Sequence, residues 1–204
     1  MNASLADVVG NHPHHNIVAG VDWGKQNDFT AISIGCGDCK VELWHDRFNK
    51  IDYAFQIKRL QVGYVAWRVR GVLPERNAMG EPIIERMIRD GVNVLQGPDN
   101  KMGFMTTSGT KPQLIENLAV AFDRTEWQFQ DDKLWTGEIE AYERTMSKIT
   151  GRSQYSAPEG LHDDTVIARA LMLWAAKSFA ALSKQPEQTS RFTTEQDGSR
   201  WKGI

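Results

Sequence analysis

Cysteine and long apolar runs are scarce in this 204-residue chain, and its charges nearly balance. Two cysteines cannot form a disulfide framework, so a reducing, cytoplasmic setting is the default expectation. No apolar run approaches the ~20 residues needed to span a bilayer, and residues 1–16 lack the basic and apolar regions of a signal peptide. A net charge of −2 excludes the overall basic character typical of nucleic-acid binders, although the 24 Lys and Arg residues can still gather on one face.

The remaining composition is that of an ordinary globular protein, with 41% hydrophobic and 25% charged residues. At this length one well-buried domain is expected. We predict a flexible leader or linker at residues 1–16, a folded domain at 17–182 and a polar, disordered tail at 183–204.

The order of the predicted elements indicates an α/β fold. Apolar patterning predicts strands at residues 17–21, 29–35, 41–48, 69–73, 92–95 and 127–129, and helices at 52–67, 81–90, 111–124, 135–146 and 163–182. Short turns join the first three strands into an antiparallel meander. The helix that follows provides a crossover, which lets strand 69–73 lie parallel beside strand 17–21. We therefore expect a mixed sheet flanked by helices.

Carboxylates follow both of these parallel strands. Asp22 ends the first and Glu75 comes just after the second, so both should lie at the edge where open α/β sheets bind ligands. Asp163 and Asp164 open the last helix, where an N-cap explains one Asp but not two in a row. Converging carboxylates repel one another unless cations lie between them, and oxygen ligands suit Mg²⁺ or Mn²⁺.

Two such ions about 3.5–4 Å apart can activate a water and stabilise the leaving oxygen in phosphodiester cleavage. The alternative is that all of these carboxylates are solvated strand ends and helix caps. Spacing alone leaves both interpretations open.

Three short motifs occur in an order that resembles the nuclease domain of bacteriophage large terminase subunits. They are Asp22-Trp23-Gly24 with Asp28-Phe29-Thr30-Ala31, then Glu75-Arg76-Asn77-Ala78-Met79-Gly80, then His162-Asp163-Asp164-Thr165 before an Ala-rich helix. Between the second and third motifs, Thr110-Lys111 with the helix to Arg124, and Glu138-Ile139 with Tyr142, are similar to that family's run of elements. The resemblance covers residues 17–182.

This resemblance implies an RNase H-like fold and a metal-dependent endonuclease that cuts concatemeric viral DNA during genome packaging. Asp22, Glu75 and Asp163 would be the catalytic metal ligands, and Asp164 would be a fourth ligand or a supporting group. The accessory candidates are Asp28, Asn77 and His162.

The resemblance also implies partners and a location. The substrate would be double-stranded DNA, cut with low sequence specificity because backbone contacts carry no base information. Complete terminase subunits carry an ATPase domain first and work with a portal protein and a small terminase subunit in the cytoplasm of the infected host cell. This sequence has no G-x-x-x-x-G-K-[ST] motif, so we expect an excised nuclease domain that binds neither ATP nor a membrane.

Basic side chains near the expected edge could contact DNA. Lys25, Arg76 and Lys111 could bind phosphates, or they could be ordinary surface charges. Two other interpretations of the whole chain remain. One is another RNase H-like nuclease of the resolvase or integrase type, which the elements at 110–142 disfavour. The other is a non-catalytic module that docks on DNA or on the portal, with purely structural carboxylates.

Two groups of possible metal ligands have ordinary explanations. Cys36 and Cys39 have the spacing of half a zinc site, but no second pair follows, so we interpret them as a hairpin turn that carries two thiols. The tract that contains His12, His14 and His15 fits a flexible linker better than a metal site.

Overall fold

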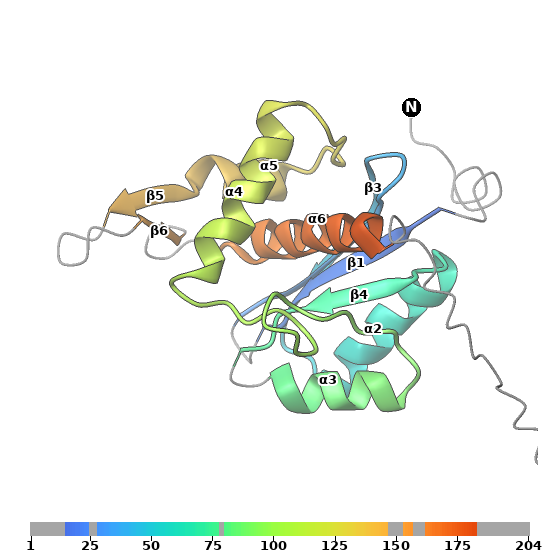
Figure 1. Ribbon diagram of the computed structural model, residues 1–204. Helices are drawn as coiled ribbons and strands as arrows, with labels where there is room; N and C mark the ends of the chain where they lie inside the picture. The colour runs from blue at the N-terminus through green and yellow to red at the C-terminus, as the bar shows by residue number, and fades with distance from the viewer. Residues whose placement is uncertain (1–14, 25–27, 78–79, 147–152, 157–161, 183–204) are drawn as a thin grey trace, which may run out of the picture.

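The computed structural model describes residues 15–24, 28–77, 80–146, 153–156 and 162–182. In chain order the elements are β1 (Ile17–Asp22), β2 (Thr30–Cys36), β3 (Val41–Phe48), α2 (Tyr53–Ala66), β4 (Gly71–Pro74), α3 (Gly80–Arg89), α4 (Thr110–Asp123), α5 (Lys133–Ala141), β5 (Glu143–Met146), β6 (Ser153–Ser156) and α6 (Asp164–Leu182) (Figure 1). None of the helices described is long and apolar enough to cross a membrane.

Four strands form one mixed sheet in the order β3-β2-β1-β4. β1, β2 and β3 pair as an antiparallel meander, whereas β4 lies parallel to β1. Helix α2 makes the crossover between β3 and β4. The predicted α/β fold, with a meander plus a parallel strand, is therefore confirmed. β5 and β6 pair separately as a two-stranded sheet.

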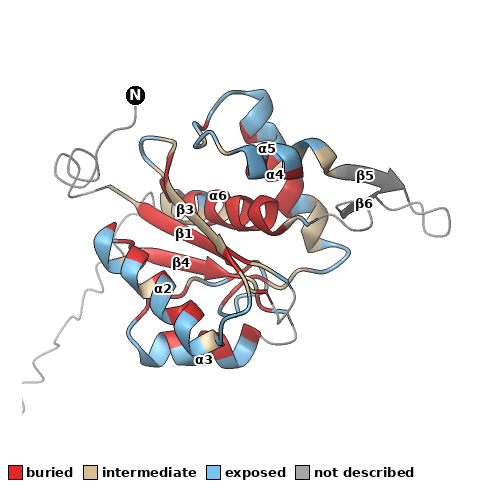
Figure 2. Cartoon of the chain, turned by 180° about the vertical axis from the view of Figure 1, so that it is seen from behind, coloured by how far each residue is buried: buried red, intermediate tan, exposed pale blue. Residues whose placement is uncertain are grey.

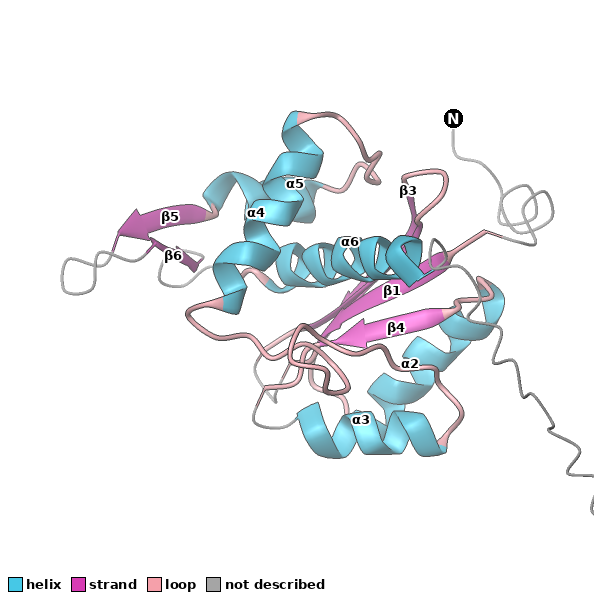
Figure 3. Ribbon diagram, in the orientation of Figure 1, coloured by secondary structure: helices cyan, strands magenta, loops and turns pink. Residues whose placement is uncertain are grey.

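Helices cover both faces of the sheet (Figure 3). α2 and α3 lie on one face, where Leu60 and Met87 pack with Val21 of β1. α6 lies on the other face, with α4 and α5 beside it, and Leu171 packs there with Val18. Buried residues of these helices face the sheet, and β1 is buried on both sides (Figure 2). This two-sided burial explains why β1 is an unbroken apolar run.

Helix α6 lies directly on β1 because Gly20 has no side chain. A Cβ atom added at Gly20 would stand 2.1 Å from the carbonyl oxygen of Ala168 and 2.3 Å from the amide nitrogen of Met172. Asp164 precedes Ala168 by about one helical turn, and Asp22 follows Gly20 by two residues of strand. The close packing therefore brings the first residues of α6 to the end of β1 where Asp22 stands.

Replacing Gly20 with Ala is expected to destabilise the protein by about 1–3 kcal/mol, because overpacking forces backbone to move. Urea unfolding followed by circular dichroism measures the change. Gly137 of α5 is the matched control, since a Cβ there meets nothing within 4 Å. Gly137→Ala should be neutral or stabilising by up to ~1 kcal/mol. Equal effects at the two glycines would contradict the packing of α6 on β1.

Three predicted elements differ from the structure. Residues 92–95 and 127–129 are not strands, and each makes only an isolated bridge, between Val72 and Val94 and between Val41 and Gln128. The helix predicted at 135–146 is α5, which ends at Ala141, and residues 143–146 form β5. Pairing with β6 stabilises β5, and local spacing cannot reveal such a partner.

Residues 1–14 and 183–204 lie outside the described residues, so the predicted leader and tail stay predictions.

Candidate active site

The ends of β1 and β4 bring Asp22 and Glu75 together. Parallel pairing places Val21 opposite Pro74, so the two acidic residues that follow lie side by side. The amide nitrogen of Glu75 donates to the carbonyl oxygen of Val21 at 2.8 Å. Burial, the negative charge of Glu75 and a hydrogen bond with the Glu75 side chain together raise the pKa of Asp22.

Asp163 and Asp164 reach the same edge from the start of α6. The helix begins at Asp164, and the amide nitrogen of Ile167 donates to the carbonyl oxygen of Asp163 at 3.0 Å. The negative charges of both Asp163 and Asp164 act on Asp22. The structure thus brings carboxylates from three distant segments together at one edge of the sheet, while their role as metal ligands stays a prediction.

Two basic side chains hold the helix-borne carboxylates. Lys111 Nζ lies 3.0 Å from Asp163 Oδ2. Arg47 Nη2 lies 3.2 Å from Asp164 Oδ2 and 3.3 Å from Glu138 Oε1. These cations partly neutralise a cluster that would otherwise be strongly self-repelling.

Protonation is favoured at this edge. Burial first, and then the negative charge of Glu75, raise the pKa of Asp22 well above its ordinary value of 3.8. Burial raises the pKa of Asp164 to about 6, although the Arg47 guanidinium acts in the opposite direction. Burial is the first cause of both shifts, and the neighbouring carboxylates add to the shift of Asp22.

The donor set fits a hard divalent cation, since carboxylate oxygens are the ligands that Mg²⁺ and Mn²⁺ prefer. No three carboxylates of the described residues yet place their donor oxygens within 4.8 Å of one another. Lys111 is paired with Asp163, and Arg47 is paired with Asp164.

The accessory candidates occupy different positions. Asn77 Nδ2 donates to Glu75 Oε1 at 2.7 Å and so orients that carboxylate. His162 is exposed, and its Nδ1 lies 3.7 Å from Asp164 Oδ2. Asp28 is exposed, and its charge adds to burial, the larger cause, in raising the pKa of Tyr53. Asn77 and His162 therefore contact the acidic cluster directly.

The candidate DNA contacts also differ from one another. Lys25 lies outside the described residues. The Arg76 side chain is only 5% exposed and forms an ion pair with Asp99, which leaves little of it for a phosphate. The Lys111 side chain is 26% exposed beside Asp163. Lys111 is thus the better placed of the two described candidates.

Two further residues support this edge: Glu138, which the resemblance includes without a role, and Arg47, which the sequence did not single out. Glu138 of α5 accepts hydrogen bonds from the amide nitrogen of Thr165, at 3.0 Å, and from its hydroxyl, so it caps α6 from a neighbouring helix. Arg47 of β3 joins Glu138 to Asp164, and its guanidinium lies 3.4 Å from the centre of the Phe29 ring. A polar residue on a strand gives no local signal for such a role, and only the fold reveals it.

Asp22→Asn is expected to stabilise the metal-free protein at neutral pH. The folded-state pKa of Asp22 is raised, so the native state holds its proton while the unfolded chain loses it above about pH 4. The free energy of unfolding of the wild type should therefore fall as pH rises through that window. The variant should gain about 0.5–2 kcal/mol at pH 7 and nothing near pH 4. Thermal unfolding in EDTA at both pH values measures this, and a destabilised variant at pH 7 would contradict it.

The chain resembles known proteins over most of its length, although no family model matches it. The large terminase subunit of Thermus virus P23-45 is 27% identical over 159 residues, which are 78% of this chain and 31% of that protein. The large terminase subunit of Thermus phage G20c is also 27% identical over 159 residues, again 78% of this chain and 31% of that protein. This chain spans about a third of the length of the curated relatives it matches.

Solved structures share its fold. The large terminase nuclease from thermophilic phage G20c with bound magnesium matches with a TM-score of 0.70 at 24% identity, over 79% of this chain and 82% of that one. The nuclease domain of the large terminase subunit gp2 of bacterial virus Sf6 matches with a TM-score of 0.62 at 10% identity, over 84% of this chain and 94% of that one. The predicted mixed sheet flanked by helices is thus confirmed as the fold of these large terminase nuclease structures, and 159 residues of the chain are similar in sequence to large terminase subunits of Thermus phages.

Proposed function

We propose that this chain is a divalent-metal-dependent DNA endonuclease, the nuclease domain of a phage large terminase subunit that cuts concatemeric viral DNA during packaging. The observation that carries the proposal is the convergence of Asp22, Glu75, Asp163 and Asp164 at one sheet edge. The fold is that of large terminase nucleases, one of which has been crystallised with magnesium and with cobalt. A variant nuclease domain from Sf6 has been crystallised with manganese.

In this proposal Asp22, Glu75 and Asp163 hold Mg²⁺ or Mn²⁺, two ions in all, and Asp164 is a fourth ligand or orients the others. When bound, such ions polarise the phosphodiester and lower the pKa of a water that attacks it. Because the pKa of Asp22 is raised, Asp22 must lose its proton before it can act as a ligand. Acid conditions should therefore weaken metal binding.

The surrounding side chains would position the substrate. Lys111 pairs with Asp163, and its ammonium would become available to a DNA phosphate if a metal cation took over that carboxylate. Arg47 and Glu138 keep Asp164 and the start of α6 in place. Contacts of this kind carry no base information, so cutting of double-stranded DNA should show little sequence preference.

In the infected host cell, the ATPase domain of the full-length subunit, the portal protein and the small terminase subunit are the partners that this role implies. ATP would bind that other domain rather than this one. The predicted partition into a leader at residues 1–16, a nuclease domain at 17–182 and a tail at 183–204 is part of the same proposal.

The function is tested by incubating the chain with supercoiled plasmid and Mn²⁺ or Mg²⁺. We expect nicked and then linear DNA with either metal, and intact DNA in EDTA, because the carboxylates alone cannot activate water. DNA that is retained in a gel shift but never cut would instead support a non-catalytic docking module. Strong preference for four-way junctions over linear duplex would support the resolvase-type alternative.

A further inference from the structure

A second group of metal-binding atoms lies at the opposite end of β1 from the carboxylates. His15 Nδ1 lies 3.3 Å from Cys36 Sγ and 3.2 Å from Cys39 Sγ. All three donor atoms lie within 4.8 Å of one another, the only such His, Cys, Asp or Glu group of three in the part of the chain that the structure describes. The sequence alone separates the histidine from the thiols by about twenty residues, which is why spacing pointed to a plain hairpin turn.

The turn between β2 and β3 holds the two thiols in a defined arrangement. Both cysteines are free, with Cys36 buried and Cys39 exposed. The amide nitrogen of Cys39 donates to Cys36 Sγ at 3.3 Å, and the amide nitrogen of Lys40 donates to the carbonyl oxygen of Cys36 at 2.9 Å. A backbone N–H group directed at a sulfur atom orients that sulfur for a cation.

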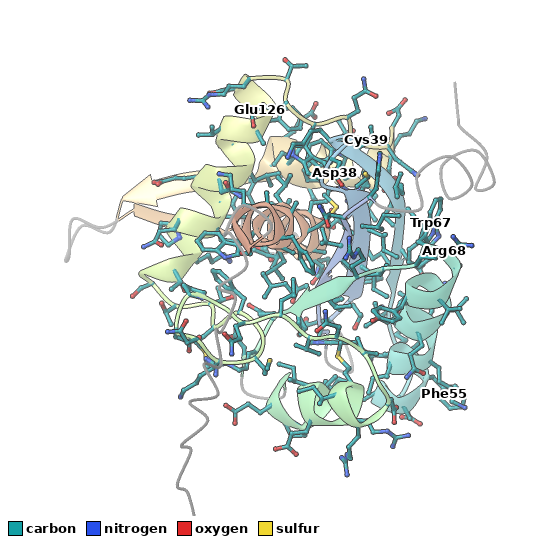
Figure 4. The ribbon with its side chains drawn as sticks, turned by 45° about the vertical axis from the view of Figure 1, so that its right-hand side comes forward. Asp38, Cys39, Phe55, Trp67, Arg68 and Glu126 are labelled. Atoms are coloured by element: carbon teal, nitrogen blue, oxygen red, sulfur yellow. The ribbon has the colours of Figure 1, made fainter. Side chains whose placement is uncertain are left out.

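A separate set of hydrogen bonds fixes the segment that carries His15 against this turn. The amide nitrogen of Gly37 donates to the carbonyl oxygen of Asn16 at 2.8 Å. The amide nitrogen of Asn16 in turn donates to Asp38 Oδ2 at 2.6 Å. Asp38 and Cys39 lie together at this turn (Figure 4). The imidazole and the thiols therefore come together through backbone contacts that need no ion.

We propose that His15, Cys36 and Cys39 bind one Zn²⁺ ion. Thiolate sulfur and imidazole nitrogen are the ligands that select zinc, whereas Mg²⁺ and Mn²⁺ prefer oxygen. Three protein ligands leave one position of a tetrahedral zinc ion for water, which the exposed side of Cys39 admits. Asp38 is an inferior fourth ligand, because its carboxylate already accepts hydrogen bonds from Asn16.

The bound ion would join the start of β1 to the β2–β3 turn. β1 has 6 residues, so this site and the end of the strand at Asp22 are separated by roughly 17 Å at about 3.3 Å per residue. The two sites share no ligand. Zinc here would hold these two segments together independently of the proposed nuclease chemistry, and each proposal can fail without the other.

Cobalt is the probe that tests the site, because cobalt bound to thiolates gives a strong near-ultraviolet charge-transfer band and cobalt bound to oxygen or imidazole alone does not. The full chain is reduced, stripped of metal and titrated with Co²⁺. We expect the band to saturate at one ion per chain and to be abolished by added Zn²⁺. Cys36→Ser and Cys39→Ser should each lose most of it, and His15→Ala should weaken binding by at least about tenfold.

Asp22→Asn is the control for the carboxylate cluster and should keep the band in full. His12 and His14 stand in the same tract of sequence, and binding by imidazoles alone gives no thiolate band. Circular dichroism of the metal-free variants checks that they remain folded. A reduced, folded wild type with no thiolate band, or a band unchanged in Cys36→Ser, would overturn the proposal. So would a Cys36–Cys39 disulfide that forms readily in the presence of stoichiometric Zn²⁺.

Discussion

Asp22→Asn is expected to reduce DNA cutting by about 10³-fold or more. A bound metal ion contributes several kcal/mol to phosphodiester cleavage, and each 1.36 kcal/mol is a factor of ten in rate. Asp22 is the member of the cluster on which the charges of Glu75, Asp163 and Asp164 all act. The amide that replaces it is a neutral and weaker ligand, so the affinity for the ion falls together with the rate. Initial rates of plasmid nicking at saturating Mn²⁺ measure the loss.

Asp90→Asn is the matched control for this variant. Asp90 is exposed next to α3 and pairs with Arg86, away from the cluster, so its loss should leave the nicking rate within about twofold of the wild type, as for most surface substitutions. Because Asp22→Asn should also stabilise the metal-free protein, a loss of cutting cannot be ascribed to unfolding. Cutting by Asp22→Asn at the wild-type rate would remove the proposed active site.

Glu42→Gln is expected to lower the free energy of unfolding by about 3–5 kcal/mol, because it leaves Arg169 buried without a counter-charge. The side chains of Arg169 and Glu42 are 1% and 0% exposed, and Arg169 Nε lies 3.0 Å from Glu42 Oε1. Ser33 Oγ also donates to Glu42 Oε1 at 2.7 Å, and Gln130 N to Glu42 Oε2 at 3.1 Å. For a chain of this size, Tm should fall by roughly 6–20 °C, which thermal unfolding measures.

Asp46→Asn on the same strand is the control for the buried pair. Asp46 pairs with Arg59, whose side chain is 50% exposed, so its removal should cost only about 0–1 kcal/mol. Replacing both Glu42 and Arg169 with Met should restore much of the lost stability, because the penalty comes from the unpaired charge. Equal, small effects of Glu42→Gln and Asp46→Asn would contradict the buried ion pair that ties β3 to α6.

The acidic edge was predictable from the sequence because it depends on backbone topology. A strand that ends in Asp22, a crossover helix and a parallel strand before Glu75 place both carboxylates together, whatever the side-chain packing. The two aspartates that open α6 are also visible in the sequence. What the sequence could not supply is the close approach of that helix to Gly20, which depends on packing between residues about 150 positions apart.

The supporting residues were not predictable because their partners are distant in the chain. Glu42 has the pattern of a solvent-facing strand residue, yet it is buried with Arg169. Phe122 of α4 is a large aromatic residue yet is 50% exposed, whereas its neighbour Ala121 is buried. His15 meets Cys36 and Cys39 only because the hydrogen bonds of Asn16 bring the segment before β1 to the β2–β3 turn. In each case a tertiary contact overrides a local pattern.

A crystal soaked in Mn²⁺ and measured at a wavelength where manganese scatters anomalously tests the central claim most directly. We expect anomalous peaks coordinated by Asp22, Glu75 and Asp163, with Lys111 displaced from Asp163. Full Mn²⁺ occupancy at other sites, with Lys111 still paired to Asp163 and no peak among these carboxylates, would contradict it.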